Sequence, residues 1–530
     1  MTLPTAIPDR HVPRAGDAPP RDWWNTPWFV VAALLLAATP LLWPAIPPLI
    51  DLPSHMSSFY VAANLDTSAT LRRYFEFHWQ LIGNLGVDLL AIPLAKALGA
   101  ELATKLVVIM IPVLTVGGML WVAREIHGEL PPTAGFALPL AYCYPLHFGF
   151  LNYCLGMALM LLAFALWLRL GRTERLGRRA ALFAAIAAAV WVAHAIAWVL
   201  LAVACLAAEL QSRRARGQAW PRALARALAA CATLSTPLIL MALAPPDGPG
   251  GVHGWFVPHE LAKWLVTLFR DRWIAVDLAT TALFVAVLLA SAAGRFGLRL
   301  RPALAAPALA LFAVFVAAPQ SINDSGFVNG RIAPYALAVL ALAVAAPGTS
   351  ERQRRGLALA ATAFLVVRTA FTTASLALYS ASYDGHLQAL DHIEPGSRVV
   401  AFSPVPCGHS LDKWWTPRVY HLASLAIVRK NAFVNTEWQV EGLQLLRVTY
   451  AAARPFEADP SETVTIGCEV EGFRRYDVAL ATVPRQAFDY VWLLEIPREL
   501  WPAQSDLQLV WSRDNAALYR IVHGPRQPAD

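Results

Sequence analysis

The sequence predicts a mainly α-helical, polytopic membrane protein with a small α/β domain at its C-terminal end. Hydrophobic residues make up 57% of the 530 residues and charged residues 15%, against roughly 45–50% and about 25% in soluble globular domains. Apolar runs long enough to cross a bilayer recur between residues 27 and 379. The sequence becomes more polar from Ser380 onward. This composition excludes a disordered, fibrous or disulfide-dense secreted chain.

The membrane part follows a Pro-rich segment, residues 1–26, which we expect to be a disordered cytoplasmic tail. The apolar run from Pro27 to Ile50 is too long for the hydrophobic region of a signal peptide, so it predicts a membrane anchor. Further runs of spanning or near-spanning length follow at about residues 103–123, 133–148, 152–168, 180–194, 196–211, 222–243, 274–293, 302–318, 332–347 and 356–379. Residues 27–379 therefore form the predicted transmembrane domain, with about 11 helices.

Arginines in the connections orient these helices, because cytoplasmic loops are enriched in Arg and Lys. Arginine clusters lie between apolar runs at residues 169–179, 213–216, 295–301 and 352–355. All of them face the cytoplasm, together with the N-terminus, only if residues 79–99 do not span. Polar residues in that segment favour a helix lying along the membrane: Asn84, Asp88 and Lys96. We therefore expect a protein of the inner (cytoplasmic) membrane, with residues 51–102 on the outer side. The loops explain the net charge of +7, so we expect no nucleic-acid partner.

Residues 380–530 form the predicted extracytoplasmic α/β domain. The segments SRVVAFSPV and DYVWLLEIP are typical of buried strands, and LDKWWTPRVYHLASLAIV indicates a helix. A hairpin is predicted for LQLVWS and AALYRIV, which RDN separates. Cys407 and Cys468 lie in this polar part, where they can form a disulfide if the domain is exported.

The first candidate site residues lie at the outer end of the first helix. Asp51 stands at the membrane boundary and is followed by Pro53 and His55. A carboxylate and an imidazole four residues apart can act as a general base and its orienting group, or as two metal ligands. The competing interpretation is that Asp51 only caps the next helix and that His55 is interfacial. A charge so near the bilayer needs a partner or water, so both interpretations stay open.

Further candidates lie at two turns between apolar runs. His147 and Asn152 flank the aromatic turn of PLHFGFLNY, and His194 lies at the turn of WVAHAIAW. Each can contact a substrate if it faces the same cavity as Asp51. The competing interpretations are that the aromatic turn anchors the helices at the interface and that a backbone group satisfies His194.

Two arginines lie away from the cytoplasmic clusters. Arg331 is at the start of an outer-side helix in NDSGFVNGRIAPY, and Arg368 lies within the last apolar run, in FLVVRTAF. An Arg inside a spanning helix normally faces a cavity, a counter-charge or an anionic ligand, and guanidinium matches phosphate well. Either can bind a lipid phosphate; the alternative for Arg368 is an ion pair with an internal acid such as Asp277.

This pattern resembles the GT-C superfamily of membrane glycosyltransferases, which includes protein mannosyltransferases, oligosaccharyltransferases and the aminoarabinose transferases of lipid A. Members have an acid at the outer end of the first helix, a long outer loop with membrane-parallel helices, and often a C-terminal outer domain. Here Asp51 takes the acid position, and residues 79–99 take the place of the parallel helix. One departure is that many members have a second acid where this chain has Asn152, with His147 nearby.

The resemblance implies a glycosyltransferase that moves a sugar from a polyprenyl-phosphate donor to an envelope glycan, lipid or protein at the outer face. Asp51 would be the catalytic carboxylate, with His55 or His194 orienting it, and Arg331 or Arg368 would bind the donor phosphate. A divalent metal stays open as a cofactor, although the missing second acid argues against a site built on two carboxylates. No nucleotide-binding motif is present in the sequence.

Two other functions are compatible with the same residues. A transporter or flippase for a lipid-linked glycan could use the cavity and the arginines without breaking a bond. A non-catalytic subunit of an envelope-polysaccharide assembly system would bind its partner through residues 380–530. Loss of the Asp51 carboxylate should abolish only the enzymatic function.

Overall fold

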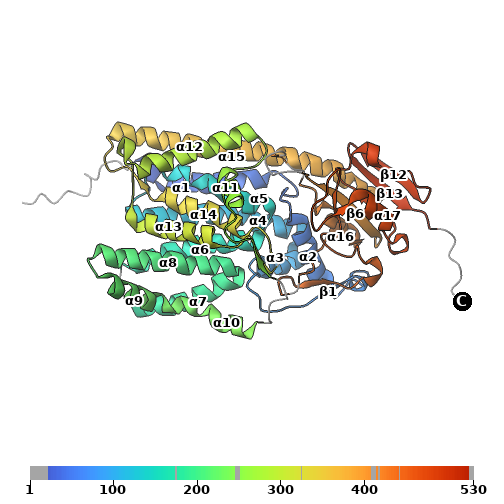
Figure 1. The fold of residues 1–530 in the computed structure, drawn as a ribbon, viewed down its shortest axis with the longest axis horizontal. Helices are drawn as coiled ribbons and strands as arrows, with labels where there is room; N and C mark the ends of the chain where they lie inside the picture. Colours follow the sequence, from blue (N-terminus) through green and yellow to red (C-terminus); the bar gives the residue numbers. More distant parts are fainter. Residues whose placement is uncertain are drawn as a thin grey trace, which may run out of the picture.

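The computed structural model describes residues 22–172, 176–244, 251–323, 325–407, 414–415, 418–440 and 442–523. Helices occupy one end of an elongated molecule, and a sheet with short helices occupies the other (Figure 1). Most of the predicted tail, residues 1–21, lies outside the described residues. The longer helices are α1 Pro27–Leu42, α4 Ala100–His127, α6 Leu151–Leu170, α7 Leu176–Ala193, α8 Ala195–Ala215, α9 Trp220–Cys231, α12 Ile274–Ala292, α13 Pro302–Ala317, α14 Val328–Leu342 and α15 Glu351–Leu387.

Five of the described helices are long and apolar enough to cross a membrane: α4, α6, α8, α12 and α15. The stretch from α9 through α10 (Pro237–Leu243) is a sixth candidate, bent by 41°. Shorter apolar helices accompany them, namely α1, α13 and α14. The predicted polytopic helical architecture is confirmed, while the number of 11 spanning helices stays a prediction.

The run over residues 133–148, which the sequence predicts as a spanning segment, is not one helix. It forms two 3-10 helices, η3 Ala134–Phe136 and η4 Leu138–Tyr142, and then the single turn α5 Tyr144–Phe148. Pro139 and Pro145 interrupt the run, because proline cannot donate a backbone hydrogen bond inside a helix. The segment packs against α15, where a Cβ on Gly135 would lie 2.6 Å from the carbonyl oxygen of Ala361.

The predicted membrane-parallel segment contains only α3, Asp88–Leu98. Its 11 residues are fewer than the roughly 20 that a span requires. That residues 79–99 lie along the membrane stays a prediction. Together with α2, Leu52–Asn64, α3 forms the region between the first long helix and α4.

The C-terminal part is built on a mixed sheet of order β10-β9-β6-β11-β13-β12, with β7 also paired to β6. Strands β9, β6 and β11 are parallel neighbours, and β11, β13 and β12 are antiparallel. Both predicted buried strands and the predicted hairpin are present: β6 Arg398–Val405, β11 Tyr490–Leu493, β12 Leu507–Arg513 and β13 Ala516–Ile521. The remaining elements are β7 Phe433–Val434, β9 Thr463–Thr465, β10 Arg474–Arg475, α16 Leu425–Lys430 and α17 Tyr476–Thr482.

The sheet domain is joined to the helical body at several places rather than by one linker. Helix α15 begins at a Ser350 capping box and continues for 37 residues, so the predicted boundary at residue 380 falls inside it. Strand β1, Phe75–Phe77, pairs with β8, Leu446–Val448. Helix α16 packs on α2, and Cys407 and Cys468 form a disulfide. The outer loop and the C-terminal domain therefore share one core.

Candidate functional site

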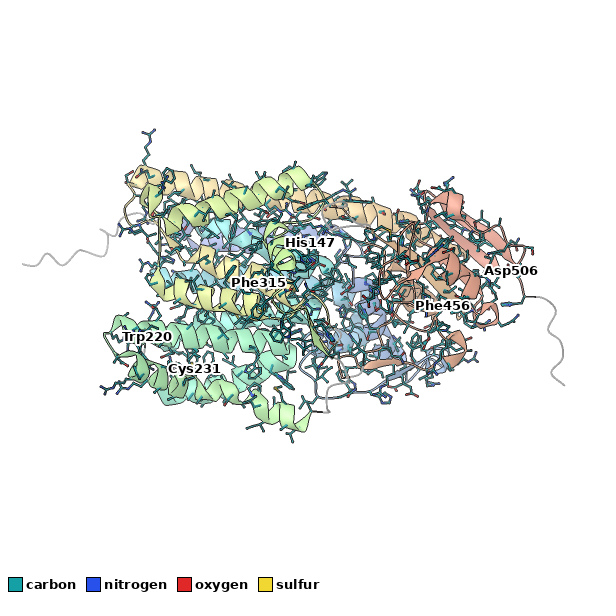
Figure 2. All side chains as sticks on the ribbon, viewed as in Figure 1. His147, Trp220, Cys231, Phe315, Phe456 and Asp506 are labelled. Atoms are coloured by element: carbon teal, nitrogen blue, oxygen red, sulfur yellow. A yellow bond between two sulfur atoms is a disulfide. The ribbon has the colours of Figure 1, made fainter. Side chains whose placement is uncertain are left out.

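A cavity of about 1090 Å³ lies between the helical body and the C-terminal domain. Its walls come from the outer loop, from α5, α6 and α14, and from the residues that precede α16. Figure 2 labels His147, a lining residue, in the middle of the molecule. The cavity brings together most of the residues predicted from the sequence: Asp51, His55, His147, Asn152, His194 and Arg331.

Asp51 occupies the N-cap position of α2, but its side chain makes no capping hydrogen bond. Its backbone N–H donates to the carbonyl oxygen of Phe148 at 2.8 Å, and the residue is 7% exposed. The carboxylate is therefore not used as a helix cap. One turn later, the His55 ring stacks on Phe59 and lies 5.0 Å from the ring of Trp438.

Gly149 allows the turn between α5 and α6 to lie against Asp51. Its φ is +102°, in the region that favours glycine. A Cβ at this position would lie 2.9 Å from both the Cβ and the backbone nitrogen of Asp51. The turn after α5 therefore packs directly against Asp51.

His147 contacts an arginine from the C-terminal domain. Its Nδ1 lies 3.1 Å from Nη2 of Arg418, and its Nε2 has no hydrogen-bond partner in the part of the chain that the structure describes. Arg418 also donates to Oδ1 of Asp271 and to the carbonyl oxygen of Pro48, both at 2.8 Å. His147 therefore belongs to a buried polar network that joins the two parts of the molecule.

Asn152 lines the cavity, but its polar atoms are engaged elsewhere. Its Oδ1 accepts from the backbone nitrogen of Val87 at 2.5 Å. Its Nδ2 donates at 2.8 Å to the carbonyl oxygen of Asn84 and to Oδ2 of Asp88. These bonds hold the start of α3 and the segment before it against α6.

His194 forms the N-cap of α8, where its Nδ1 accepts from the backbone nitrogen of Ile196 at 3.2 Å. The ring meets Tyr153 edge-on at 5.1 Å. Tyr153 in turn donates through its hydroxyl to the carbonyl oxygen of Arg331 at 2.8 Å. His194 thus has a structural role and also lines the cavity near Arg331.

Arg331 lies in the first turn of α14, 8% exposed, with its guanidinium 3.7 Å above the ring of Phe150. Its Nη2 donates to the carbonyl oxygen of Gly326 at 2.9 Å and to the hydroxyl of Ser325 at 3.2 Å. Its Nε is buried and has no hydrogen-bond partner among the described residues. Arg270 and Lys263 also line the cavity.

Arg368 is not among the residues that line the cavity. Its Nη1 donates to Oδ1 of Asp277 at 2.5 Å, and its Nη2 donates to the carbonyl oxygen of Phe269 at 2.7 Å. The other carboxylate oxygen of Asp277 accepts from the indole of Trp414 at 2.7 Å. The ion pair that the sequence leaves open as the alternative is therefore present.

Three residues that sequence analysis does not single out complete the site: His421, Asp459 and Glu462. The Nε2 of His421 lies 3.8 Å from Oδ1 of Asp51 and 4.0 Å from Oδ1 of Asp459. Its Nδ1 lies 3.8 Å from Oε1 of Glu462. These residues belong to no compact motif; only the polar interruptions YHLAS and EADPSET in an otherwise apolar domain mark them.

Burial and like charges shift the pKa values of Asp51 and His55. Burial, and then the neighbouring carboxylate of Asp459, raise the pKa of Asp51 well above its usual value, and Arg331 opposes this change. Burial and the neighbouring His421 lower the pKa of His55 to about 4. His55 is therefore neutral near pH 7.

No protein-family model and no curated protein matches the sequence. Solved structures do. ArnT from Cupriavidus metallidurans, in the apo state and bound to undecaprenyl phosphate, is similar over 94% of this chain and 99% of its own, with a TM-score of 0.52 in both cases. The chain has the fold of ArnT. Sequence identity is 14% and 15%, so the likeness establishes the fold alone. Because ArnT is a GT-C glycosyltransferase, the predicted resemblance to the GT-C superfamily is confirmed at the level of the fold.

Proposed function

We propose that the protein transfers a sugar from a polyprenyl-phosphate donor to an envelope glycan, lipid or protein. The observation that carries this proposal is the cavity in which Asp51 and Arg331 face a common space, between the helical body and the C-terminal domain. The ArnT-like fold supports it, since one of the similar structures holds undecaprenyl phosphate.

Arg331 binds the donor phosphate in this proposal. Its buried Nε has no partner, while its Nη2 is fixed by Ser325 and Gly326. A guanidinium held in this way can donate to phosphate without reorganising. As the bond between the anomeric carbon and the phosphate oxygen breaks, negative charge develops on the phosphate, and Arg331 stabilises it.

Asp51 accepts the proton of the acceptor hydroxyl, whose oxygen attacks the anomeric carbon. The polyprenyl phosphate leaves with the electron pair of the broken bond, so charge and atoms balance. The absence of a capping hydrogen bond leaves the carboxylate available. His55, on the next turn of the same helix, lines the same space and orients the acceptor.

We infer that the protein lies in an inner membrane, with its N-terminus in the cytoplasm and its C-terminal domain outside. The Cys407–Cys468 disulfide supports this orientation, because disulfides persist in oxidising compartments. A lipid-linked donor is compatible with the outer face, because its use requires no nucleotide there.

The test is transfer from a labelled polyprenyl-phosphate hexose by purified protein in nanodiscs, with a cell-envelope extract as acceptor. Asp51→Asn should lower transfer roughly 10²–10⁴-fold, the contribution of a general base, and keep donor binding. Arg331→Met should lose donor binding. Asp477→Asn, a change at an exposed residue of the C-terminal domain, is the matched control and should act as wild type.

Two outcomes would overturn the proposal. Donor binding by wild type without any transfer would favour a transporter for a lipid-linked glycan. No donor binding at all would favour an assembly subunit that binds a partner through residues 380–530.

A further inference from the structure

We propose that the C-terminal domain holds a divalent transition-metal ion beside Asp51, through His421, Asp459 and Glu462. One potential ligand atom from each of these residues lies within 4.8 Å of the others. This arrangement of one imidazole nitrogen and carboxylate oxygens is a donor set for Mn²⁺ or Zn²⁺. The site does not depend on the proposed function, because it is defined by binding alone.

The hydrogen bond of His421 to Thr436 leaves its other nitrogen facing the carboxylates of Asp459 and Asp51, while Glu462 lies nearer to Nδ1. Nδ1 lies 3.0 Å from the carbonyl oxygen of Thr436, so it carries the proton. Nε2 then has a free lone pair, and it lies 4.0 Å from Oδ1 of Asp459 and 3.8 Å from Oδ1 of Asp51. Metal-binding histidines are commonly fixed by such a bond to a backbone carbonyl. The ring of Trp438, 4.7 Å away, also packs against the imidazole.

Glu462 supplies a second, independent observation that points to a cation. The residue has no solvent exposure, and no donor among the described residues bonds to its Oε2, while the neighbouring carboxyl of Asp459 adds like charge. A buried carboxylate oxygen without a partner is costly. Among the described residues, His421 is the one basic group within 4.0 Å of Asp51, Asp459 and Glu462. A bound cation would compensate all three carboxylates.

The ion has a route to the site and an adjacent ligand. His421 and Asp459 line the cavity, so the site opens into it. Asp51 borders the site from the helical body and can supply a further oxygen. The cation would therefore join the C-terminal domain to the residue at the start of α2.

The experiment measures metal binding by the full chain in nanodiscs after treatment with chelator. Mn²⁺ is titrated and followed by electron paramagnetic resonance, with Zn²⁺ as competitor, and thermal unfolding is recorded with and without metal. Wild type should bind one Mn²⁺ per chain, release it to Zn²⁺, and unfold at a higher temperature when loaded. Asp459→Asn and His421→Gln should each weaken binding by roughly tenfold or more.

Glu437→Gln is the control. This carboxyl is buried at the same interface and accepts hydrogen bonds from Ser54 and Ser57, but it is outside the group of ligands. It should bind metal as wild type does. The inference is overturned if wild type binds neither ion at millimolar concentration, or if the folded Asp459→Asn protein binds as tightly as wild type. Since binding is measured without a sugar substrate, its failure is distinct from a failure of sugar transfer.

Discussion

Arg331 and Arg368 are both buried cations in apolar helices, but they differ in the groups to which they donate hydrogen bonds. Arg368 forms an ion pair with Asp277, and its second terminal nitrogen donates to a backbone carbonyl. Arg331 has neutral partners and an unsatisfied Nε in the wall of the cavity. A buried charge in a direct ion pair stabilises one arrangement of helices, whereas a buried charge whose direct hydrogen-bond partners are neutral is suited to an anionic ligand.

Replacing Arg368 by methionine should therefore affect stability rather than ligand binding. The change leaves Asp277 buried without its cation, and breaking a buried pair in this way typically costs about 3–5 kcal/mol. The measurement is thermal unfolding in detergent, together with donor binding by the folded fraction. The double change Arg368→Met with Asp277→Asn should recover part of the loss, because the amide oxygen can still accept from Trp414. Normal stability with lost donor binding would instead assign Arg368 to the ligand.

The cavity residues on the side of the helical body could be predicted from the sequence. Asp51, His147 and His194 could be found because each is a polar residue at an end of an apolar run. His421, Asp459 and Glu462 could not, because no local pattern relates residue 421 or 459 to residue 51. His421 comes close to Asp51 because α16 and the turn before it pack on α2, a non-local contact.

The turn between α5 and α6 is the element that fixes the position of Asp51. The backbone nitrogen of Asp51 donates to Phe148, and the next residue, Gly149, has φ +102°. The apolar run over 133–148 predicted a spanning helix, but its prolines divide it into short turns that end at this loop. Its hydrophobicity reflects burial inside the protein and not contact with lipid.

Gly149→Ala should displace Asp51 and reduce transfer roughly 10²-fold, the effect of a misplacement near 1 Å. The new Cβ would meet Asp51 at 2.9 Å, and the left-handed backbone adds about 1–2 kcal/mol of strain. Gly128→Ala is the matched control, because Gly128 has φ +80° but nothing within 4 Å of its Cβ position. It shares the backbone strain without the contact. Equal transfer rates in the two variants would contradict a positioning role for the Gly149 turn.

In the whole molecule, the C-terminal domain forms part of the cavity wall. Its strands could be predicted from short apolar runs rich in β-branched and aromatic residues, and the membrane helices from their length. The docking of this domain on the outer loop could not be predicted, because the paired strands β1 and β8 are about 370 residues apart in sequence. Long-range pairing of this kind leaves no local signal.

The stability of this domain should depend on pH through Asp489, next to the central strands. Burial alone would raise its pKa, but hydrogen bonds from Arg398 outweigh burial and hold the pKa of Asp489 below its usual value. A carboxyl with a depressed pKa contributes stability above its unfolded pKa of about 3.9, and this stability is lost as pH falls through the lower folded value.

Asp489→Asn should therefore lower the free energy of unfolding by roughly 1–3 kcal/mol near pH 7, the usual value of hydrogen bonds to a charged group. Wild type and the variant should converge when the pH falls below the folded pKa, because the wild-type carboxyl is then protonated. Unfolding can be followed by hydrogen exchange of the backbone amides of β11, whose residues are buried in the same sheet. Asp477→Asn removes an exposed pair with Arg475 and should change little at any pH. A difference between wild type and Asp489→Asn that persists unchanged into strong acid would show that the carboxylate charge is not what stabilises the sheet.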